Sequence, residues 1–476
     1  MSSYLEGEND LKQPHFATKV AGIPGLPQLS MQGKELIKEG RPVVLQAAGD
    51  IAELGKPISK VLQEWIEHTR NTTRDPKTNK PIFPRAQGEV FDFDPRYMPQ
   101  FPIMEPIAKS YGLEGPFRGI QVNGGRTIID LVTQALIVRW QQQKAKRGGG
   151  GNQKVAVVVD PLAWPGYKDL FEDYNDTFGT DFIRGIHVSI ADGHGLKMST
   201  SGLADALDFA NDQGRDVIGV TPIIPSNPTG EGLDAQELMR IIEMAAGHDI
   251  PTIIDALYSL IDEKGQKDAL HLEEIAKKLP SEVLQYLGLY TGVTKATSSS
   301  KKTAEILWHM PEGENEVGTD IMNTVHTKML NRNLYPAPDH ALVTLALHTF
   351  PGGVHAALGE RYIALNETRN ALRNIFDSLE IPFTIGGSFY GTAALADPVS
   401  KVTLVRDVDG RPVTDPKLIA KTLLDQHNLV GAQGAMFSPA QTANSMLRLS
   451  AAATPQDIER LANILANMKD FASKHE

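Results

Sequence analysis

The chain has 476 residues, a formal net charge of −11 at pH 7 and no cysteine. A chain of this length is too long to fold around one simple core, so we expect two or three domains. The ordinary fractions of hydrophobic and charged residues indicate a globular protein. The acidic balance argues against bulk binding of nucleic acid, which needs a basic surface, and the lack of cysteine excludes disulfides and thiolate metal sites. We expect no metal site.

The beginning of the chain has no pattern typical of a secretory signal. Residues 1–8 are acidic and contain no apolar core, and no apolar stretch reaches the ~18 residues that a membrane-spanning helix requires. We therefore expect a cytoplasmic protein that binds neither a membrane nor nucleic acid.

The first third of the chain is predicted to be irregular and then helical. Residues 1–30 are rich in proline and glycine and are predicted to form an arm. The segments 32–38 and 58–69 space their apolar residues as a helix does, and 43–50 between them has a strand pattern. Residues 71–84 are polar and contain proline, so we expect an exposed loop there.

From about Gly119 onward, short apolar runs alternate with helical stretches. The apolar runs are 155–159, 186–190, 217–220, 252–254 and 287–290. The helical stretches are 126–146, 202–213, 234–246 and 271–285. Because the runs are rich in β-branched residues and lack polar alternation, this order predicts an α/β fold with a mostly parallel sheet covered by helices.

The C-terminal third is predicted to form a smaller α+β unit after a helix-rich connector at 339–379. Its strand patterns are 402–405 and 446–449, and its helical patterns are 416–426 and 455–470. We predict an arm at 1–30, a small domain built from 31–85 and 340–476, and a large cofactor-binding domain at 86–339.

Residues that can hold a cofactor follow the ends of the predicted strands, where open α/β sheets bind their ligands. Gly124 and Gly125 follow the run 120–122 and open a helix at Arg126, so that free backbone N–H groups could bind an anion. A plain tight turn is the alternative. Trp164 follows the next strand, and its ring could stack on an aromatic ligand or pack in the core.

Four further residues offer an amide, a carboxylate, a phenol and an amine. Asn227 precedes Pro228 in a turn that needs no function by itself. Asp255 ends an apolar strand, where a carboxylate is costly unless it is paired, and a helix N-cap is the alternative. Tyr258 follows three residues later and could face the same side, whereas Lys295 could be an ordinary solvated strand end.

This set of groups is what a pyridoxal phosphate (PLP) site requires. The amine forms a Schiff base with the aldehyde, and the carboxylate keeps the ring nitrogen protonated so that the ring accepts electrons. The amide and the phenol hydrogen-bond the oxygen of the ring. The order of these residues along one sheet is harder to explain by chance than any of them alone.

With these motifs the chain resembles the fold type I, PLP-dependent aminotransferases from about Gly40 to Phe471. The most specific segments are Asn-Pro-Thr-Gly at 227–230, Asp255-x-x-Tyr258, Thr294-Lys295 and Leu-Arg-Leu-Ser at 447–450. The resemblance implies a seven-stranded type of sheet, PLP as the cofactor, an amino acid and a keto acid as substrates, and a homodimer with shared active sites.

The resemblance also implies a role for each residue around the PLP ring. Lys295 is similar to the Schiff-base lysine that also moves the proton, and Asp255 is similar to the partner of the ring nitrogen. Asn227 and Tyr258 correspond to the residues that hydrogen-bond the ring oxygen. Trp164 corresponds to the stacking aromatic.

Other residues correspond to the phosphate and substrate sites. Gly124, Gly125 and Arg126 are similar to the phosphate cup. Arg448 is similar to the arginine that binds the α-carboxylate, a bidentate role that suits a guanidinium group, and Gly49 is a second candidate for substrate binding. Tyr97 is similar to the tyrosine that reaches the phosphate in the neighbouring subunit, although Pro102 stands where a glycine is usual.

The loop after Lys295 departs from the family pattern. The family places a phosphate-binding arginine eight residues after its lysine, where this chain has Thr303. We predict that Lys302, helped by nearby serines, replaces that arginine. Ser300-Lys301 also imitates the Ser-Lys step of the family, so Lys301 remains an alternative to Lys295.

Three functions remain open at this level. Transamination through a lysine Schiff base is the leading one. A PLP-dependent lyase or synthase that eliminates or replaces a side-chain group, or forms a carbon–carbon bond on an activated amino acid such as S-adenosylmethionine, is the second. A protein that kept the fold and lost turnover is the third.

Overall fold

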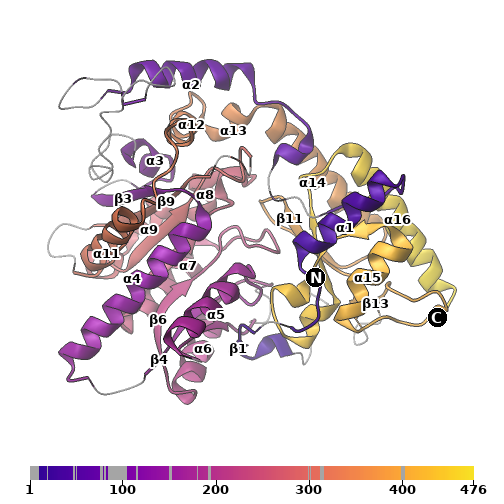
Figure 1. Ribbon diagram of the computed structural model, residues 1–476, viewed down its shortest axis with the longest axis horizontal. Helices are drawn as coiled ribbons and strands as arrows, with labels where there is room; N and C mark the ends of the chain where they lie inside the picture. The colour runs from indigo at the N-terminus through magenta and orange to yellow at the C-terminus, as the bar shows by residue number, and fades with distance from the viewer. Residues whose placement is uncertain are drawn as a thin grey trace.

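The computed structural model describes the chain from Asp10 to His475, except residues 19, 47–48, 50, 75–78, 80–81, 84–103, 114–115, 150–152, 180, 191–194, 299, 301, 311–315 and 398–401. In Figure 1 a large part built around one sheet lies beside a smaller part that contains the C-terminus. In the described part of the chain, no helix is long and apolar enough to cross a membrane.

The larger part is built on a sheet that has eight strands within the described residues, in the order β1-β5-β4-β6-β7-β8-β9-β3. Its strands are β1 (His15–Phe16), β3 (Phe117–Val122), β4 (Lys154–Val159), β5 (Ile183–His187), β6 (Arg215–Thr221), β7 (Thr252–Asp255), β8 (Leu287–Thr291) and β9 (Ala304–His309). Strands β5, β4, β6, β7 and β8 run parallel, whereas β1, β9 and β3 pair antiparallel at the two edges. The prediction of a mostly parallel, helix-covered sheet is confirmed.

Helices cover both faces of this sheet. They are α3 (Met104–Ser110), α4 (Gly125–Lys146), α5 (Gly166–Phe178), α6 (Thr200–Asp212), α7 (Ala235–Gly247), α8 (Gln266–Leu270), α9 (Leu272–Lys278), α10 (Ser281–Leu284) and α11 (Glu316–Arg332). Strand β4 shows the double burial: Ala156 and Val158 pack in one hydrophobic cluster, and Val155 and Val157 pack in the other. Two buried faces explain why these strands read as continuous apolar runs.

The helix predicted at 271–285 is interrupted in the structure. It divides into α9 and α10, and Pro280 stands at the N-cap of the second piece. Proline lacks the backbone N–H that would continue the first helix, so the chain turns there.

The smaller part combines segments from both ends of the chain. Its strands are β2 (Val44–Leu45), β10 (Phe383–Ile385), β11 (Tyr390–Ala394), β12 (Ala396–Asp397), β13 (Val402–Thr403), β14 (Leu429–Val430), β15 (Ala432–Gln433) and β16 (Met446–Ser450). Its helices, with those of the connector, are α1 (Leu26–Lys38), α2 (Lys60–Thr72), α12 (Pro338–His348), α13 (Gly353–Leu358), α14 (Glu360–Ser378), α15 (Pro416–His427) and α16 (Pro455–Ser473). Because β2 pairs with β14, the N-terminal and C-terminal segments share one small unit.

The N-terminal segment departs from its prediction in two places. Helix α1 begins at Leu26, inside the predicted arm, with proline in its first turn, a position that suits proline. Among the described residues of the predicted strand 43–50, Val44 and Leu45 form a strand, β2, that pairs with β14. The predicted boundary between 339 and 340 falls inside α12, and the one between 85 and 86 lies outside the described residues; both stay predictions.

Candidate functional site

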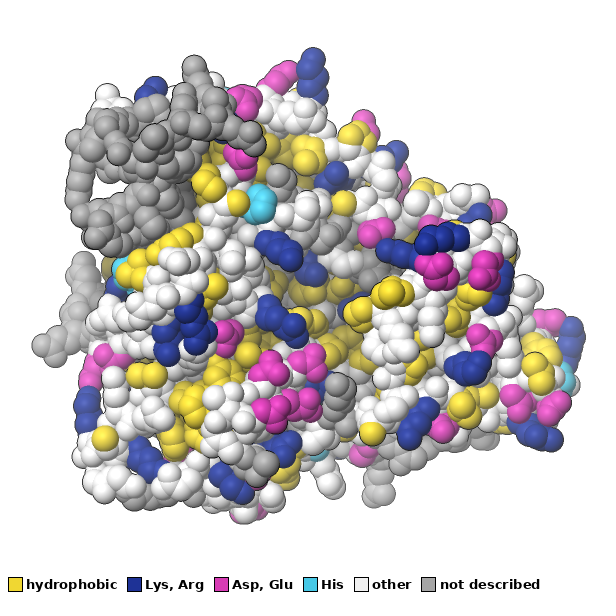
Figure 2. Space-filling model, viewed as in Figure 1, with side chains coloured by type: hydrophobic (Ala, Val, Ile, Leu, Met, Phe, Trp, Pro, Cys, Tyr) yellow, Lys and Arg dark blue, Asp and Glu magenta, His cyan; other side chains and the backbone are white. Residues whose placement is uncertain are grey.

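A cavity of about 590 Å³ lies beyond the carboxyl ends of the parallel strands, where the α/β architecture places ligands. Figure 2 shows this view of the molecule hollowed near its centre, with hydrophobic side chains in the depression and Lys or Arg side chains beside it. The sequence candidates that line the cavity are Gly124, Gly125, Arg126, Trp164, Asn227, Asp255, Tyr258, Lys295 and Lys302. Residues from five separate stretches of the chain therefore meet in one place.

Asp255 ends β7 and is 3 % exposed. Burial raises the pKa of its carboxyl to about 6, although a hydrogen bond from Tyr167 and the nearby charge of Lys295 act in the opposite direction. Its Oδ1 accepts a hydrogen bond from the backbone of Leu257 at 3.3 Å. The residue caps no helix in the described chain, because the next helical turn begins only at Ser259. Asp255 is thus a costly buried carboxylate of the kind that a cationic ligand can stabilise.

Tyr167 is a site residue that the sequence analysis missed. Its hydroxyl donates to Asp255 Oδ2 at 2.7 Å. Burial and the charge of Asp255 raise the pKa of Tyr167 well above its ordinary value, so the phenol remains a donor. Its position in the sequence could have indicated it, because Tyr167 follows Trp164 by three residues and lies in the first turn of α5. This hydrogen bond fixes the orientation of the carboxylate.

Asn227 and Tyr258, which line the cavity, form a connected group with Arg448, which does not line it. Asn227 Nδ2 donates to the Tyr258 hydroxyl at 3.1 Å, and Arg448 Nη1 donates to Asn227 Oδ1 at 2.9 Å. Arg448 is 4 % exposed, and its Nε has no hydrogen-bond partner among the described residues. No carboxylate of the described chain lies within ion-pair distance of it. A buried cation in this state suits an anionic ligand.

The Asn-Pro-Thr-Gly turn is held against the small part of the molecule. Thr392 Oγ1 donates to the carbonyl of Pro228 at 3.2 Å. Gly230 has φ +72°, and a Cβ there would lie 2.4 Å from the carbonyl oxygen of Tyr390. Only glycine satisfies both the backbone angle and the close approach. The turn therefore aims Asn227 at Arg448, which comes from a distant strand.

The other end of the cavity has the features of an anion site. Helix α4 begins at Gly125, and Gly124 before it has φ +136°, so backbone N–H groups of the first turn are free. A Cβ on Gly124 would lie 3.7 Å from Cβ of Lys302, which places this lysine beside the helix start. Thr303 is buried and its hydroxyl bonds to that of Thr344 at 2.9 Å, so it does not line the cavity.

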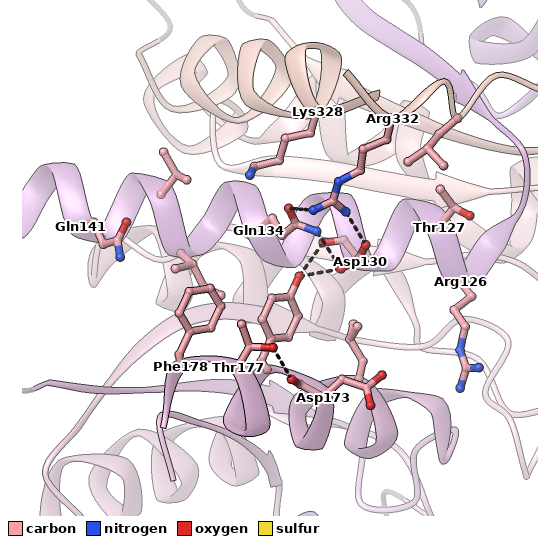
Figure 3. A pocket seen from close by; sticks show the side chains of 15 residues that line it. Arg126, Thr127, Asp130, Gln134, Gln141, Asp173, Thr177, Phe178, Lys328 and Arg332 are labelled. Atoms are coloured by element: carbon pink, nitrogen blue, oxygen red, sulfur yellow. Dashed lines mark hydrogen bonds and ion pairs between the residues drawn. The ribbon is translucent and has the colours of Figure 1, made fainter. Parts of the chain in front are cut away.

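Arg126 lies at the rim of the cavity. Its side chain is 67 % exposed, with Nη2 at 3.6 Å from Asp169, and its guanidinium lies 5.8 Å from the ring centroid of Trp164. In Figure 3 the same side chain stands at one end of a second cavity of about 730 Å³ between α4, α5 and α11. Trp164 is partly buried and lines the first cavity, so stacking remains available to it.

Lys295 extends its amine into the cavity beside two other candidates. Its Nζ lies 5.3 Å from the ring centroid of Tyr258, and a Cβ on Gly49 would be 3.9 Å from it. Its backbone carbonyl accepts from the N–H of Ile51 at 3.2 Å, which anchors the loop. Lys301 and Tyr97 lie outside the described residues, so the roles given to them stay predictions.

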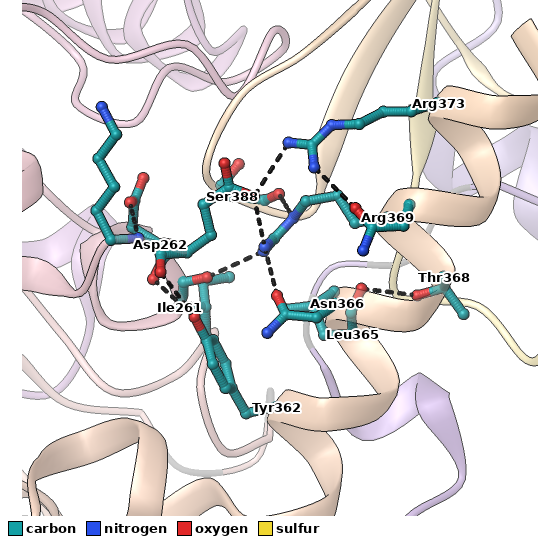
Figure 4. A network of polar contacts seen from close by, with 12 residues as sticks. Ile261, Asp262, Tyr362, Leu365, Asn366, Thr368, Arg369, Arg373 and Ser388 are labelled. Carbon is teal, nitrogen blue, oxygen red and sulfur yellow. Dashed lines mark hydrogen bonds and ion pairs between the residues drawn. The ribbon is translucent and has the colours of Figure 1, made fainter. Parts of the chain in front are cut away.

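The buried Arg369 holds together two segments that carry tyrosines of this site. Arg369 of α14 donates to the carbonyl of Ile261 at 3.2 Å and to that of Ser388 at 3.0 Å, and it pairs with Glu263 at 3.3 Å (Figure 4). Ile261 follows Tyr258 by one turn, and Ser388 begins the segment that leads to Tyr390. One side chain thus fastens both tyrosine-bearing segments to the same helix.

Comparisons with known proteins agree with the overall fold. Residues 144–301 match the family model of class I and II aminotransferases. The aspartate aminotransferase of Thermus thermophilus with maleate is 15 % identical, with a TM-score of 0.64 over 94 % of this chain and 97 % of that one. The alanine aminotransferase of Pyrococcus furiosus is 15 % identical, with a TM-score of 0.65 over 94 % and 98 %. The curated protein sequences contain no match.

Proposed function

We propose that the chain is a PLP-dependent aminotransferase of fold type I and moves an amino group between an amino acid and a keto acid, because residues 144–301 match the class I and II aminotransferase family and the fold is similar to that of known aminotransferases. One observation carries the proposal. The Lys295 amine and the buried Asp255 carboxylate line one cavity together with Asn227 and Tyr258, and the buried Arg448 donates to Asn227 from behind that lining.

The residues present fit PLP. The volume of about 590 Å³ lies in the range of small-molecule sites. Asp255 offers a carboxylate for a ring nitrogen, Asn227 and Tyr258 offer donors for a ring oxygen, and the start of α4 offers N–H groups for a phosphate. When bound, PLP supplies an aldehyde that reacts with amines and a ring that withdraws electrons from the α-carbon of the substrate.

Each residue then has a defined task. Lys295 would hold PLP through its aldehyde, and its Nζ would be the base that takes the proton from the α-carbon of the amino acid. Asp255, oriented by Tyr167, would hold the proton on the ring nitrogen. Arg448 binds the α-carboxylate through nitrogens that have no carboxylate partner in the described chain, and its bond to Asn227 fixes the guanidinium. The proposal includes a homodimer in which Tyr97 of one copy reaches the phosphate bound by the other.

Half-reaction spectroscopy tests the reaction type. The PLP-loaded protein is mixed with single amino acids, without a keto acid. With at least one amino donor, we expect the cofactor absorbance to change to that of its amine form while one equivalent of keto acid appears, and an added keto acid should reverse the change. No conversion with any donor contradicts transamination. Release of a keto acid without the amine form favours the lyase or synthase.

Lys302 is expected to bind the phosphate. Lys302→Ala should raise the dissociation constant of PLP about tenfold, because a charge-assisted contact beside the helix start is lost. Lys328→Ala is the matched control, since it removes the same charge from the second cavity (Figure 3) and should leave PLP binding unchanged. Titration of the cofactor absorbance measures both constants. A Lys302→Ala protein that binds PLP as tightly as the parent would refute this role.

A further inference from the structure

Tyr390 is a buried residue outside the cavity lining that contacts two of the site residues. It begins β11 and is 2 % exposed. The carbon at the centre of the Arg448 guanidinium lies 3.9 Å from the centroid of its ring. The centroid of the Tyr390 ring also lies 5.4 Å from that of Tyr258, with an angle of 60° between the ring planes. The ring of Tyr390 therefore contacts both the Arg448 guanidinium and the ring of Tyr258.

The pairing register keeps this arrangement in place. In the antiparallel pair of β11 and β16, Tyr390 stands opposite Ser450 and Thr392 stands opposite Arg448. Tyr390 and Arg448 are thus diagonal neighbours on one face of the sheet, a separation that aromatic and long side chains span. Phe437 lies 5.4 Å from the same guanidinium, so the cation is enclosed by two rings.

The polar end of Tyr390 continues the contact to Tyr258. The two phenols share a hydrogen bond, and Asn227 Nδ2 donates to the Tyr258 oxygen as well. The four side chains therefore form a closed ring: Arg448 to Asn227, Asn227 to Tyr258, Tyr258 to Tyr390, and Tyr390 to Arg448. Because burial and the bond to Tyr390 both raise the pKa of Tyr258, they favour the protonated phenol, and the Asn227 amide donates to the same oxygen.

We propose that Tyr390 is a positioning residue with two separable parts: its ring face orients Arg448 for the substrate carboxylate, and its hydroxyl orients Tyr258 toward the ring oxygen of the cofactor. The proposal rests on the PLP function proposed above. The stacked ring stabilises the guanidinium without consuming its N–H donors, so these remain available for a carboxylate.

Two substitutions separate the parts. Tyr390→Phe keeps the ring and removes the hydroxyl, whereas Tyr390→Leu removes both. Should Tyr390→Leu fail to fold, Tyr390→Met fills the space without an aromatic face and carries the same comparison. Two measurements are made on PLP-loaded protein: the dissociation constant of acetate by calorimetry, and the pH midpoint of the cofactor absorbance.

Tyr390→Leu should weaken acetate binding about tenfold, because a desolvated cation–π contact is lost. Tyr390→Phe should bind acetate within about twofold of the parent. Its pH midpoint should rise by about half a unit, because a weaker hydrogen bond from Tyr258 leaves the ring oxygen with more affinity for a proton. An unchanged acetate constant in Tyr390→Leu overturns the role of the ring, and an unchanged midpoint in Tyr390→Phe overturns that of the hydroxyl.

Matched controls distinguish these effects from general damage. Phe376→Leu removes a fully buried ring that stacks on Phe383 at 4.1 Å, and should lower the thermal midpoint while leaving acetate binding unchanged. Tyr174→Phe removes a hydroxyl bonded to Asp130 in the second cavity and should not move the absorbance midpoint. If the parent protein binds no PLP, the proposed function fails. If it binds PLP and the Tyr390 variants match it, only this inference fails.

Discussion

Lys295→Ala is expected to lower the rate of the amino-donor half-reaction by about 10⁴-fold, because it removes the group that transfers the proton. The variant should still bind PLP through Asp255 and the start of α4, but it should lack the absorbance of lysine-bound cofactor. The structural reason is placement: the Lys295 amine lies in the cavity, 5.3 Å from the Tyr258 ring and next to Gly49.

The alternative lysine is tested in the same experiment. Borohydride reduction of the PLP-loaded parent, followed by peptide mapping, should label Lys295. Lys301→Ala should keep the absorbance of lysine-bound cofactor and most of the rate. A label on Lys301, or a Lys295→Ala protein with the parent spectrum, would show that the wrong lysine was assigned.

Asp255→Asn is expected to stabilise the protein without cofactor and to impair the enzyme. Burial raises the pKa of Asp255 from 3.8 to about 6. With about 1.4 kcal/mol for each unit, ionising this group in the folded state costs roughly 3 kcal/mol at neutral pH. Because the folded pKa lies above the unfolded one, the cost is absent below about pH 4, grows as the pH rises to 6 and is complete above that.

Urea unfolding of the cofactor-free proteins measures this cost. The free energy of unfolding of Asp255→Asn should exceed that of the parent by about 3 kcal/mol at pH 8, and the difference should vanish near pH 4. Asp249→Asn is a control of opposite sign: burial raises the pKa of Asp249, but hydrogen bonds from Arg139 and Tyr286 outweigh it and lower the pKa. That variant should lose stability at neutral pH. A pH-independent difference for Asp255→Asn would contradict the buried charge.

The same substitution should reduce the half-reaction rate by about 10³-fold, the range found when a preorganised electrostatic partner is removed. Its amide cannot pair with a protonated ring nitrogen, so the cofactor loses its partner while the folded protein gains stability. A gain in stability together with a loss of activity separates a functional carboxylate from a structural one.

Sequence periodicity predicted the large sheet well where strands are buried on both faces. The runs at 155–159 and 252–254 contain few polar residues because helices cover them, and β4 and β7 were found there. Strands β9 and β11 were missed. Each follows polar or glycine-containing residues, and each has one antiparallel partner strand far away in the chain as well as one nearby.

The sequence by itself determined which residues are candidates for the site: the order of Asn227, Asp255, Tyr258 and Lys295, each after a predicted strand, predicted PLP chemistry before any geometry was known. The tertiary structure alone decided which groups touch. It directed the Arg126 side chain to the rim, brought Lys302 beside Gly124, and placed Tyr167 on Asp255 and Tyr390 on Arg448. The physical reason is range. Spacing along the chain encodes local turns and faces, whereas these contacts depend on strand register and on the packing of segments that are far apart in sequence.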